Sequence, residues 1–123
     1  MQVVICTGTS LRHRALARRI TMSKKYKVSK IYYESGDLLA SQVSNSNNNE
    51  LQLNHLKARS QSEIDFFQWF VNYSPKNSTN IEETIERGWF NSEDFLTSIE
   101  ELKPDFILIY GTSIIKGDIL KKY

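Results

Sequence analysis

Two short apolar runs, each followed by the same three residues, stand out in the hydrophobic pattern of the chain. The run at 3–6 leads through Thr7 into Gly8-Thr9-Ser10, and the run at 106–110 leads into Gly111-Thr112-Ser113. A short apolar run between turn residues is typical of a strand buried on both faces, as in a parallel sheet. We therefore expect strands at 2–7 and 105–110. Their two small polar loops would lie at the carboxyl edge of one sheet, where open α/β sheets bind ligands.

Between these two strands, the pattern changes from helical to extended and back. Helices are expected at about 11–24, which Ser10 can cap, and at about 51–73, where apolar residues recur at helical spacing. The β-forming residues at 28–34 predict a strand. Residues 81–90 fit either a short helix or an irregular crossing segment.

The last third of the chain has clear helix boundary signals. Asn91-Ser92 is typical of a helix start, and Pro104 ends that helix. Residues 116–123 have the pattern of another helix opening. The order β-α-β-α-irregular-α-β-α predicts an α/β fold, a Rossmann-like parallel sheet with flanking helices and right-handed crossovers.

The helix at about 51–73 has an apolar face with a polar stripe beside it. The expected face consists of Leu53, Leu56, Ile64, Phe67, Phe70 and Val71. His55, Arg59 and Glu63 follow at i, i+4 and i+8, and Glu63 falls close to the centre of the apolar face. A buried carboxylate needs a partner, which Arg59 could supply from one turn away. The stripe is either a structural ion pair or a lining of the site at the sheet edge.

Length, composition and charge limit the class of protein. The 123 residues make one domain or part of one, with no second domain expected, and the polar stretch at about 44–50 is expected to be a mobile loop. A net charge of +2 gives no argument for a nucleic-acid partner, and none is expected. The single Cys6 fits a reduced compartment, and no apolar run reaches the roughly 20 residues that span a bilayer. We expect a cytoplasmic protein.

The first loop carries groups that can hold an anion. Gly8, Thr9, Ser10 and Arg12 combine helix-start amides, hydroxyls and a guanidinium, which suit a phosphate or carboxylate. The alternative is a plain turn followed by a solvated basic helix, with Arg14, Arg18 and Thr21 opposite the apolar side. His13 falls toward that apolar side, where a packed, hydrogen-bonded histidine is the expected role.

The second loop has a different character. Tyr110, Gly111, Thr112, Ser113, Ile114 and Ile115 combine open backbone with two bulky apolar residues, which can line a slot for a flat ring. The alternative is a turn followed by core residues of the next helix. No dinucleotide fingerprint or P-loop lysine is present, which disfavours a nucleotide-dependent oxidoreductase. His13 and His55 lie 42 positions apart without a cysteine or carboxylate cluster, so no metal site is expected.

Taken together, several segments resemble the amino-terminal part of the folate-dependent formyltransferases. These are Arg12-His13-Arg14-x-x-Ala17, His55-x-x-x-Arg59-x-x-x-Glu63-x-x-Phe66-Phe67, Asn91-Ser92, Pro104-Asp105-x-Ile107-Leu108 and Gly111-Thr112-Ser113-Ile114-Ile115-Lys116. The family includes glycinamide ribonucleotide transformylase, methionyl-tRNA formyltransferase and the sugar N-formyltransferases. The resemblance is strongest to a bacterial subgroup of mostly uncharacterised members, and it covers most of the chain apart from the Asn-rich stretch.

The resemblance implies transfer of a formyl group from 10-formyltetrahydrofolate to a small-molecule amine, with a nucleotide-linked amino sugar as one acceptor class. It assigns the loop from Tyr110 to Ile115 to the pterin ring and the loop from Gly8 to Arg12 to the acceptor. The family also uses an Asn-x-His motif, then a Pro and an Arg, and a later Asp to stabilise an oxyanion and move protons. None of this later set is present in these 123 residues, and the Asn-x-His would be expected about ten residues beyond Tyr123.

The chain alone is therefore expected to be an incomplete formyltransferase domain without catalytic residues. The alternative is a non-catalytic ligand-binding module, or a degenerate remnant, built on the same half-fold. The sequence does not fix the acceptor or the oligomeric state.

Overall fold

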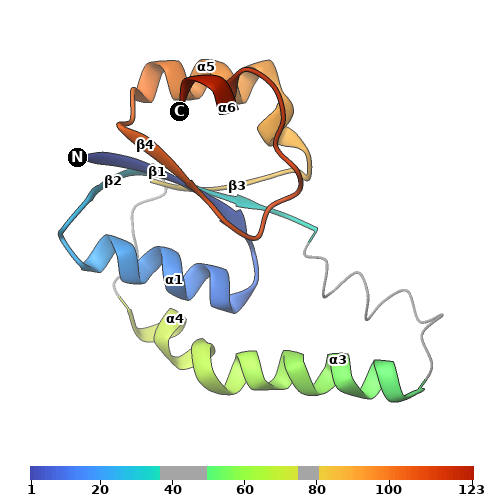
Figure 1. The fold of residues 1–123 in the computed structure, drawn as a ribbon. Coiled ribbons are helices and arrows are strands. Elements are labelled where there is room, and N and C mark those ends of the chain that lie inside the picture. The colour runs from blue at the N-terminus through green and yellow to red at the C-terminus, as the bar shows by residue number, and fades with distance from the viewer. Residues whose placement is uncertain (37–49, 75–80) are drawn as a thin grey trace.

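The computed structural model describes residues 1–36, 50–74 and 81–123. It contains a four-stranded parallel sheet in the order β3-β2-β1-β4, formed by β1 (Gln2–Gly8), β2 (Lys27–Glu34), β3 (Glu82–Ile85) and β4 (Phe106–Ile109) (Figure 1). The expected α/β fold with parallel strands is confirmed. The loop expected at about 44–50 lies outside the described residues, except that Glu50 begins a helix.

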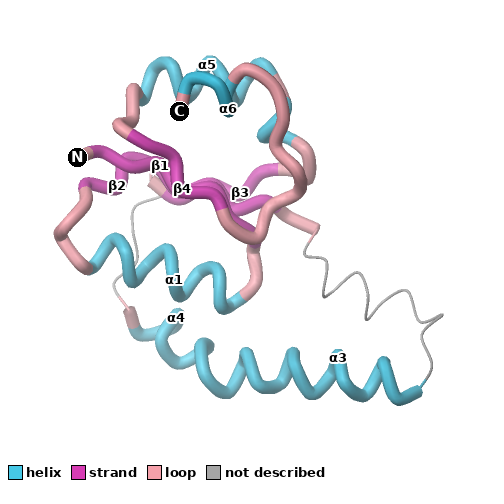
Figure 2. Tube along the Cα trace, in the orientation of Figure 1, coloured by secondary structure: helices cyan, strands magenta, loops and turns pink. Residues whose placement is uncertain are grey.

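Helices cover both faces of this sheet (Figures 1 and 2). One face carries α1 (Leu11–Met22) and, outside it, a long helix made of α3 (Glu50–Glu63), η1 (Ile64–Gln68) and α4 (Trp69–Tyr73). The other face carries α5 (Glu93–Leu102) and the short α6 (Ile119–Lys122), preceded by the 3₁₀ turn η2 (Trp89–Asn91). The helices predicted at about 11–24 and 51–73 and after Ser92 are confirmed.

Neither expectation for the segment at 81–90, a short helix or an irregular crossing segment, is correct: it is a strand followed by a 3₁₀ turn. β3 pairs in parallel with β2, from Ile31 opposite Glu82 to Glu34 opposite Ile85. β4 pairs only with β1 among the described residues, so it lies at one edge of the sheet. The expectation that its apolar run is buried on both faces is wrong: Phe106, Ile107 and Leu108 are half-buried, and Ile109 is 38% exposed.

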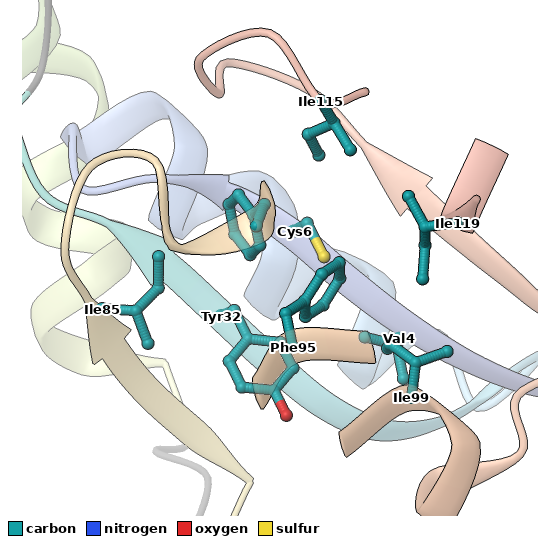
Figure 3. Packing of buried hydrophobic residues seen from close by; sticks show 9 residues of the cluster. Val4, Cys6, Tyr32, Ile85, Phe95, Ile99, Ile115 and Ile119 are labelled. Atoms are coloured by element: carbon teal, nitrogen blue, oxygen red, sulfur yellow. The ribbon is translucent and has the colours of Figure 1, made fainter. Parts of the chain in front are cut away.

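The main core lies between the sheet and α5. Val4, Cys6 and Tyr32 project from the strands toward Phe95 and Ile99 of that helix, and Ile115 and Ile119 complete the cluster (Figure 3). The rings of Tyr32 and Phe95 meet edge-on at 5.8 Å, a favourable aromatic geometry. The smaller core on the α1 side consists of Ile5, Ala17, Ile31 and Tyr33.

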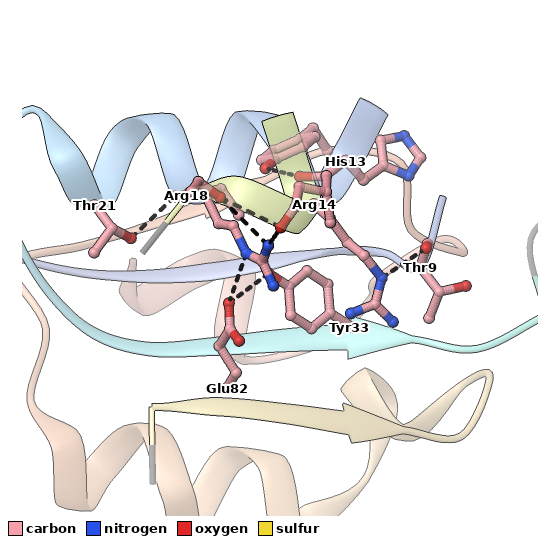
Figure 4. A network of polar contacts seen from close by, with 11 residues as sticks. Thr9, His13, Arg14, Arg18, Thr21, Tyr33 and Glu82 are labelled. Carbon is pink, nitrogen blue, oxygen red and sulfur yellow. Dashed lines mark hydrogen bonds and ion pairs between the residues drawn. The ribbon is translucent and has the colours of Figure 1, made fainter. Parts of the chain in front are cut away.

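The expected faces of α1 are only partly correct. Arg18 is buried and Leu16 is 46% exposed, the reverse of a solvated basic face. Arg18 donates to the carbonyl of Val71 in α4 and lies 3.8 Å from a carboxylate oxygen of Glu82 in β3 (Figure 4). An internal cation joins three elements, which helical periodicity alone does not reveal.

The long helix also departs from its expected face. Of the six apolar residues assigned to that face, only Val71 is buried, while Ile64 is 40% exposed. The reason is that the long helix lies outside α1, at the surface of the molecule, so even its inner side is only partly covered. Apart from Ile64, the predicted positions are nevertheless the less exposed side of this helix, both before and after the π-helical segment η1.

Candidate functional site

The direction of strand addition reverses beside β1. The chain runs outward from β1 through β2 to β3 and then returns to place β4 on the opposite side of β1. In open α/β sheets, ligands bind at such a switch point, outside the carboxyl ends of the strands. The loops after β1 and β4 start there, so the topology brings the two sequence-predicted loops to one place.

His13 fills the space between these two loops. A Cβ placed on Gly8 would lie 2.7 Å from His13 Nδ1 and 2.8 Å from the carbonyl oxygen of Gly111. A Cβ placed on Gly111 would overlap the His13 ring directly, and Gly111 also has a φ of +68°. Both glycines are therefore required by close approach, and His13 is the packed histidine that the sequence predicts.

The Ser10 side chain bonds to His13 rather than to the backbone at the start of α1. The residue occupies the N-cap position of α1, but its side chain makes no capping bond. Its hydroxyl instead lies 2.8 Å from Nδ1 of His13, so the expected capping role is wrong. Arg14 donates from Nε to the carbonyl of Thr9 at 3.0 Å and holds the first loop from its other side.

A buried carboxylate that the sequence reasoning did not single out holds the second loop. Glu34, at the end of β2, accepts from the backbone N–H of Ser113 at 2.6 Å and from the Ser113 hydroxyl at 2.7 Å. It also accepts from the backbone N–H of Gly88 at 3.0 Å. Its position as the last residue of a strand beside two loops was the one available signal. Three charge-assisted hydrogen bonds make this clamp strong.

Asn91 holds the same loop further along. Its side-chain amide donates to the carbonyl of Ile114 at 2.9 Å, and its side-chain oxygen accepts from the N–H of Lys116 at 2.8 Å. Between the two clamps, Ile114 is 76% exposed whereas Ile115 belongs to the core. The two isoleucines predicted to line a slot therefore differ, because Ile114 is exposed to solvent whereas Ile115 is a core residue.

Tyr110 and Cys6 are poor candidates for proton transfer. Burial raises the pKa of Tyr110 to about 12, although the nearby Thr7 side chain acts to lower it. The Tyr110 hydroxyl donates to the carbonyl of His13 at 3.1 Å, which fixes the ring against the first loop. Burial, and then the charge of Glu34, raise the pKa of the Cys6 thiol, which stays protonated. Both groups are structural at neutral pH.

The stripe on the long helix does not act as a unit. Glu63 forms an ion pair with Arg12 of α1 rather than with Arg59, so the expected partner is wrong. His55 and Arg59 are exposed on α3. Because α3 lies outside α1, only the last member of the stripe, Glu63, reaches the first loop, through Arg12. The expected alternative of a solvated basic helix is wrong for Arg18, which is buried, and Arg12 is paired with Glu63.

An apolar pocket of about 600 Å³ adjoins this region between α1 and the η1–α4 segment. Arg12, His13 and Tyr110 line its wall nearest the loops. Within the described ranges, no group of three or more histidine, cysteine or carboxylate side chains is arranged to hold a metal ion. Over the same ranges, no helix is both long and apolar enough to cross a bilayer.

The described residues define an α/β protein with a parallel sheet flanked by helices, and the two loops meet at the edge where open sheets of this kind bind ligands. No protein-family model matches the chain, and neither a curated protein nor a solved structure matches it.

Proposed function

We propose that the chain forms the ligand-binding part of a 10-formyltetrahydrofolate-dependent formyltransferase that acts on a small-molecule amine, with nucleotide-linked amino sugars as one acceptor class. The observation that carries this proposal is the meeting of the loops at 8–12 and 110–115 at the switch point beside β1. Some of the residue motifs that resemble the family lie in these loops and in the helix that supplies Glu63, and the others lie in α1, before α5 and in β4.

The second loop is the donor side. Its backbone is fixed by Glu34 and Asn91, so its polar groups are pre-organised for hydrogen bonds with a ring such as a pterin. The exposed Ile114 side chain supplies an apolar surface against which a flat ring can pack. Bound 10-formyltetrahydrofolate supplies the formyl group, and the residues of this loop would bind and orient its ring.

The first loop is the acceptor side. It leads into the amino end of α1, a helix of 12 residues whose N–H groups and dipole favour an anionic group. Arg12 stands at this end. Its guanidinium carries five N–H donors, so its ion pair with Glu63 leaves others for a phosphate of the acceptor. We assign no catalytic role to any of the 123 residues, because the sequence lacks the Asn-x-His motif.

Titration with 5-formyltetrahydrofolate, a stable relative of the donor, tests the donor side by calorimetry. We expect saturable binding that Ile114→Ala weakens about threefold to tenfold, because part of the apolar wall is lost. Leu120→Ala is the matched control, since Leu120 is also an exposed aliphatic residue, on α6. A chain that does not bind 5-formyltetrahydrofolate, or that loses equal affinity in both variants, would contradict the proposal.

A further inference from the structure

The pocket between α1 and the long helix has a floor that follows one helical stripe. Arg12, Ala15, Leu16 and Arg19 line it from α1, at positions i, i+3, i+4 and i+7. Residues at this spacing share one face of a helix. The floor therefore has an apolar centre with one guanidinium at each end, two turns or roughly 10 Å apart along the axis.

The facing wall is aromatic and is shaped by the π-helical segment. Phe66, Phe67, Trp69 and Phe70 line it, all within or just after η1. Trp69 and Phe70 are nearly parallel, with ring centroids 6.3 Å apart at an angle of 13°. Trp69 is 67% exposed, although a residue of this size usually packs against protein. π-Helical turns are frequent at functional sites.

The two arginines differ in whether a carboxylate of the described residues pairs with the guanidinium. The charge of Arg12 is balanced by Glu63. Arg19 is exposed, and no carboxylate among the described residues pairs with its guanidinium. No carboxylate of the described residues lines the pocket either. An apolar space with one unbalanced positive charge at its rim is complementary to an apolar ligand with a negative group.

From this shape and charge, we propose that the pocket binds a small aromatic anion. Its one or two rings would lie between Leu16 and the Trp69–Phe70 pair, with the negative group at Arg19. A volume of about 600 Å³ is within the usual range for pockets that enclose small organic ligands. The site shares Arg12, His13 and Tyr110 with the sheet edge, but its ring-binding residues lie on α1 and the long helix. It does not depend on the proposed formyl transfer.

Two fluorescent probes of nearly the same shape test the proposal. 8-Anilinonaphthalene-1-sulfonate carries a sulfonate, and N-phenyl-1-naphthylamine has the same rings without charge. We expect saturable binding of both by the folded monomer. Arg19→Gln should weaken binding of the sulfonate about threefold to fivefold and leave the neutral probe unchanged, because an exposed ion pair contributes modestly. Trp69→Ala should weaken binding of both probes about tenfold, since it removes a stacking surface.

Lys57→Gln is the matched control for charge, because Lys57 is an exposed cation on α3 that does not line the pocket. All variants must unfold cooperatively at the parent's urea midpoint, which separates pocket binding from probe uptake by a loosened chain. The proposal is wrong if neither probe binds. It is also wrong if Arg19→Gln and Lys57→Gln act alike, or if Arg19→Gln weakens both probes equally. A dimer whose association displaces the probe would assign the pocket to a second copy instead.

The same variants separate this site from the proposed donor site. Ile114→Ala should bind 8-anilinonaphthalene-1-sulfonate as the parent does, whereas Arg19→Gln should bind 5-formyltetrahydrofolate as the parent does. If folate binding fails and Arg19→Gln still discriminates between the probes, the formyltransferase proposal falls and the pocket proposal stands. If Ile114→Ala weakens the sulfonate as much as Arg19→Gln does, the pocket is not a separate site.

Discussion

Glu34 and Ser113 lie 79 residues apart in the sequence and are joined by two hydrogen bonds at the carboxyl edge of the sheet. The carboxylate accepts from both the backbone and the side chain of Ser113. One buried side chain thus ties the end of β2 to the loop after β4, across the central strand that separates them.

The first prediction concerns this clamp. Glu34→Gln places an NH₂ group among donors, so at least one N–H or O–H loses its acceptor. We expect the free energy of unfolding to fall by about 2–3 kcal/mol, as for a hydrogen bond to a buried charge. Hydrogen exchange should accelerate at the amide of Ser113. Glu86→Gln, at an exposed position, should change stability by less than about 0.5 kcal/mol. Unchanged exchange at Ser113 would argue against the clamp.

The second prediction concerns the close approach of Gly111 to His13. Gly111→Ala should cost about 3 kcal/mol or more, from steric overlap with the ring and from a φ of +68°. Gly117→Ala is the matched control, because Gly117 has a φ of +87° and open space around it. It should cost about 1 kcal/mol in urea unfolding. Combining Gly111→Ala with His13→Ala should recover part of the loss, and strict additivity would contradict the packing argument.

The third prediction concerns the internal cation. Arg18→Met keeps the stem of the side chain but removes the donor to Val71 and the charge near Glu82. The free energy of unfolding should fall by about 2–3 kcal/mol, because a buried carbonyl loses a charged donor and Glu82 loses a nearby cation while it keeps the Tyr33 hydroxyl as a donor. Arg19→Gln, one residue further along α1 but exposed, should cost less than about 0.5 kcal/mol. Equal losses in the two variants would show that burial of Arg18 does not matter.

The fourth prediction concerns alkaline pH. Burial raises the pKa of Tyr110 to about 12 from the ordinary 10. The unfolded chain therefore loses this proton first, so the stability contribution is complete below pH 10 and is lost as pH rises toward 12. Burial also raises the pKa of Tyr33, and the neighbouring Glu82 raises it further.

Urea unfolding at pH 8 and between pH 10 and 12 measures this effect. At pH 8, Tyr110→Phe should be about 1 kcal/mol less stable than the parent, because the hydrogen bond to the carbonyl of His13 is lost. Between pH 8 and high pH, the free energy of unfolding of the variant should decrease by about 1–2 kcal/mol less than that of the parent, because the variant lacks the tyrosine that titrates. A variant whose stability falls as steeply as that of the parent would contradict the shifted pKa.

Local signals predicted the parts of the fold that depend on few residues. Ser92 caps α5 by accepting from the N–H of Phe95 at 3.2 Å, and the helix ends before Pro104 as expected, with Lys103 as a left-handed C-cap. The strand at Glu82–Ile85 could not be recognised, because two glutamates and a threonine give no apolar pattern. This strand forms because it pairs with β2, and because Glu82 lies near the guanidinium of Arg18 and accepts a hydrogen bond from the Tyr33 hydroxyl.

The sequence predicted where the candidate site lies, but not which side chains bond to one another within it. Two Gly-Thr-Ser loops after apolar strands were enough to indicate the sheet edge. The partners of Glu63 and Glu34 could not be predicted, because Arg12 and Ser113 come close to them only after the sheet and helices have packed. The aromatic wall of the pocket includes a π-helical turn, which a sequence pattern with a fixed helical period does not predict.

The central place of β1 also determines when the fold can form during synthesis. Gln2 donates to the side chain of Asp105 and accepts from its backbone N–H, across 103 positions of sequence. At about 5–20 residues per second on a ribosome, roughly 5–20 s separate the appearance of these two partners. Until then β1 has β2 beside it and an open edge on the other side. β1 is thus paired on one side well before it is paired on the other, which exposes the nascent chain to chaperones and to association during that interval.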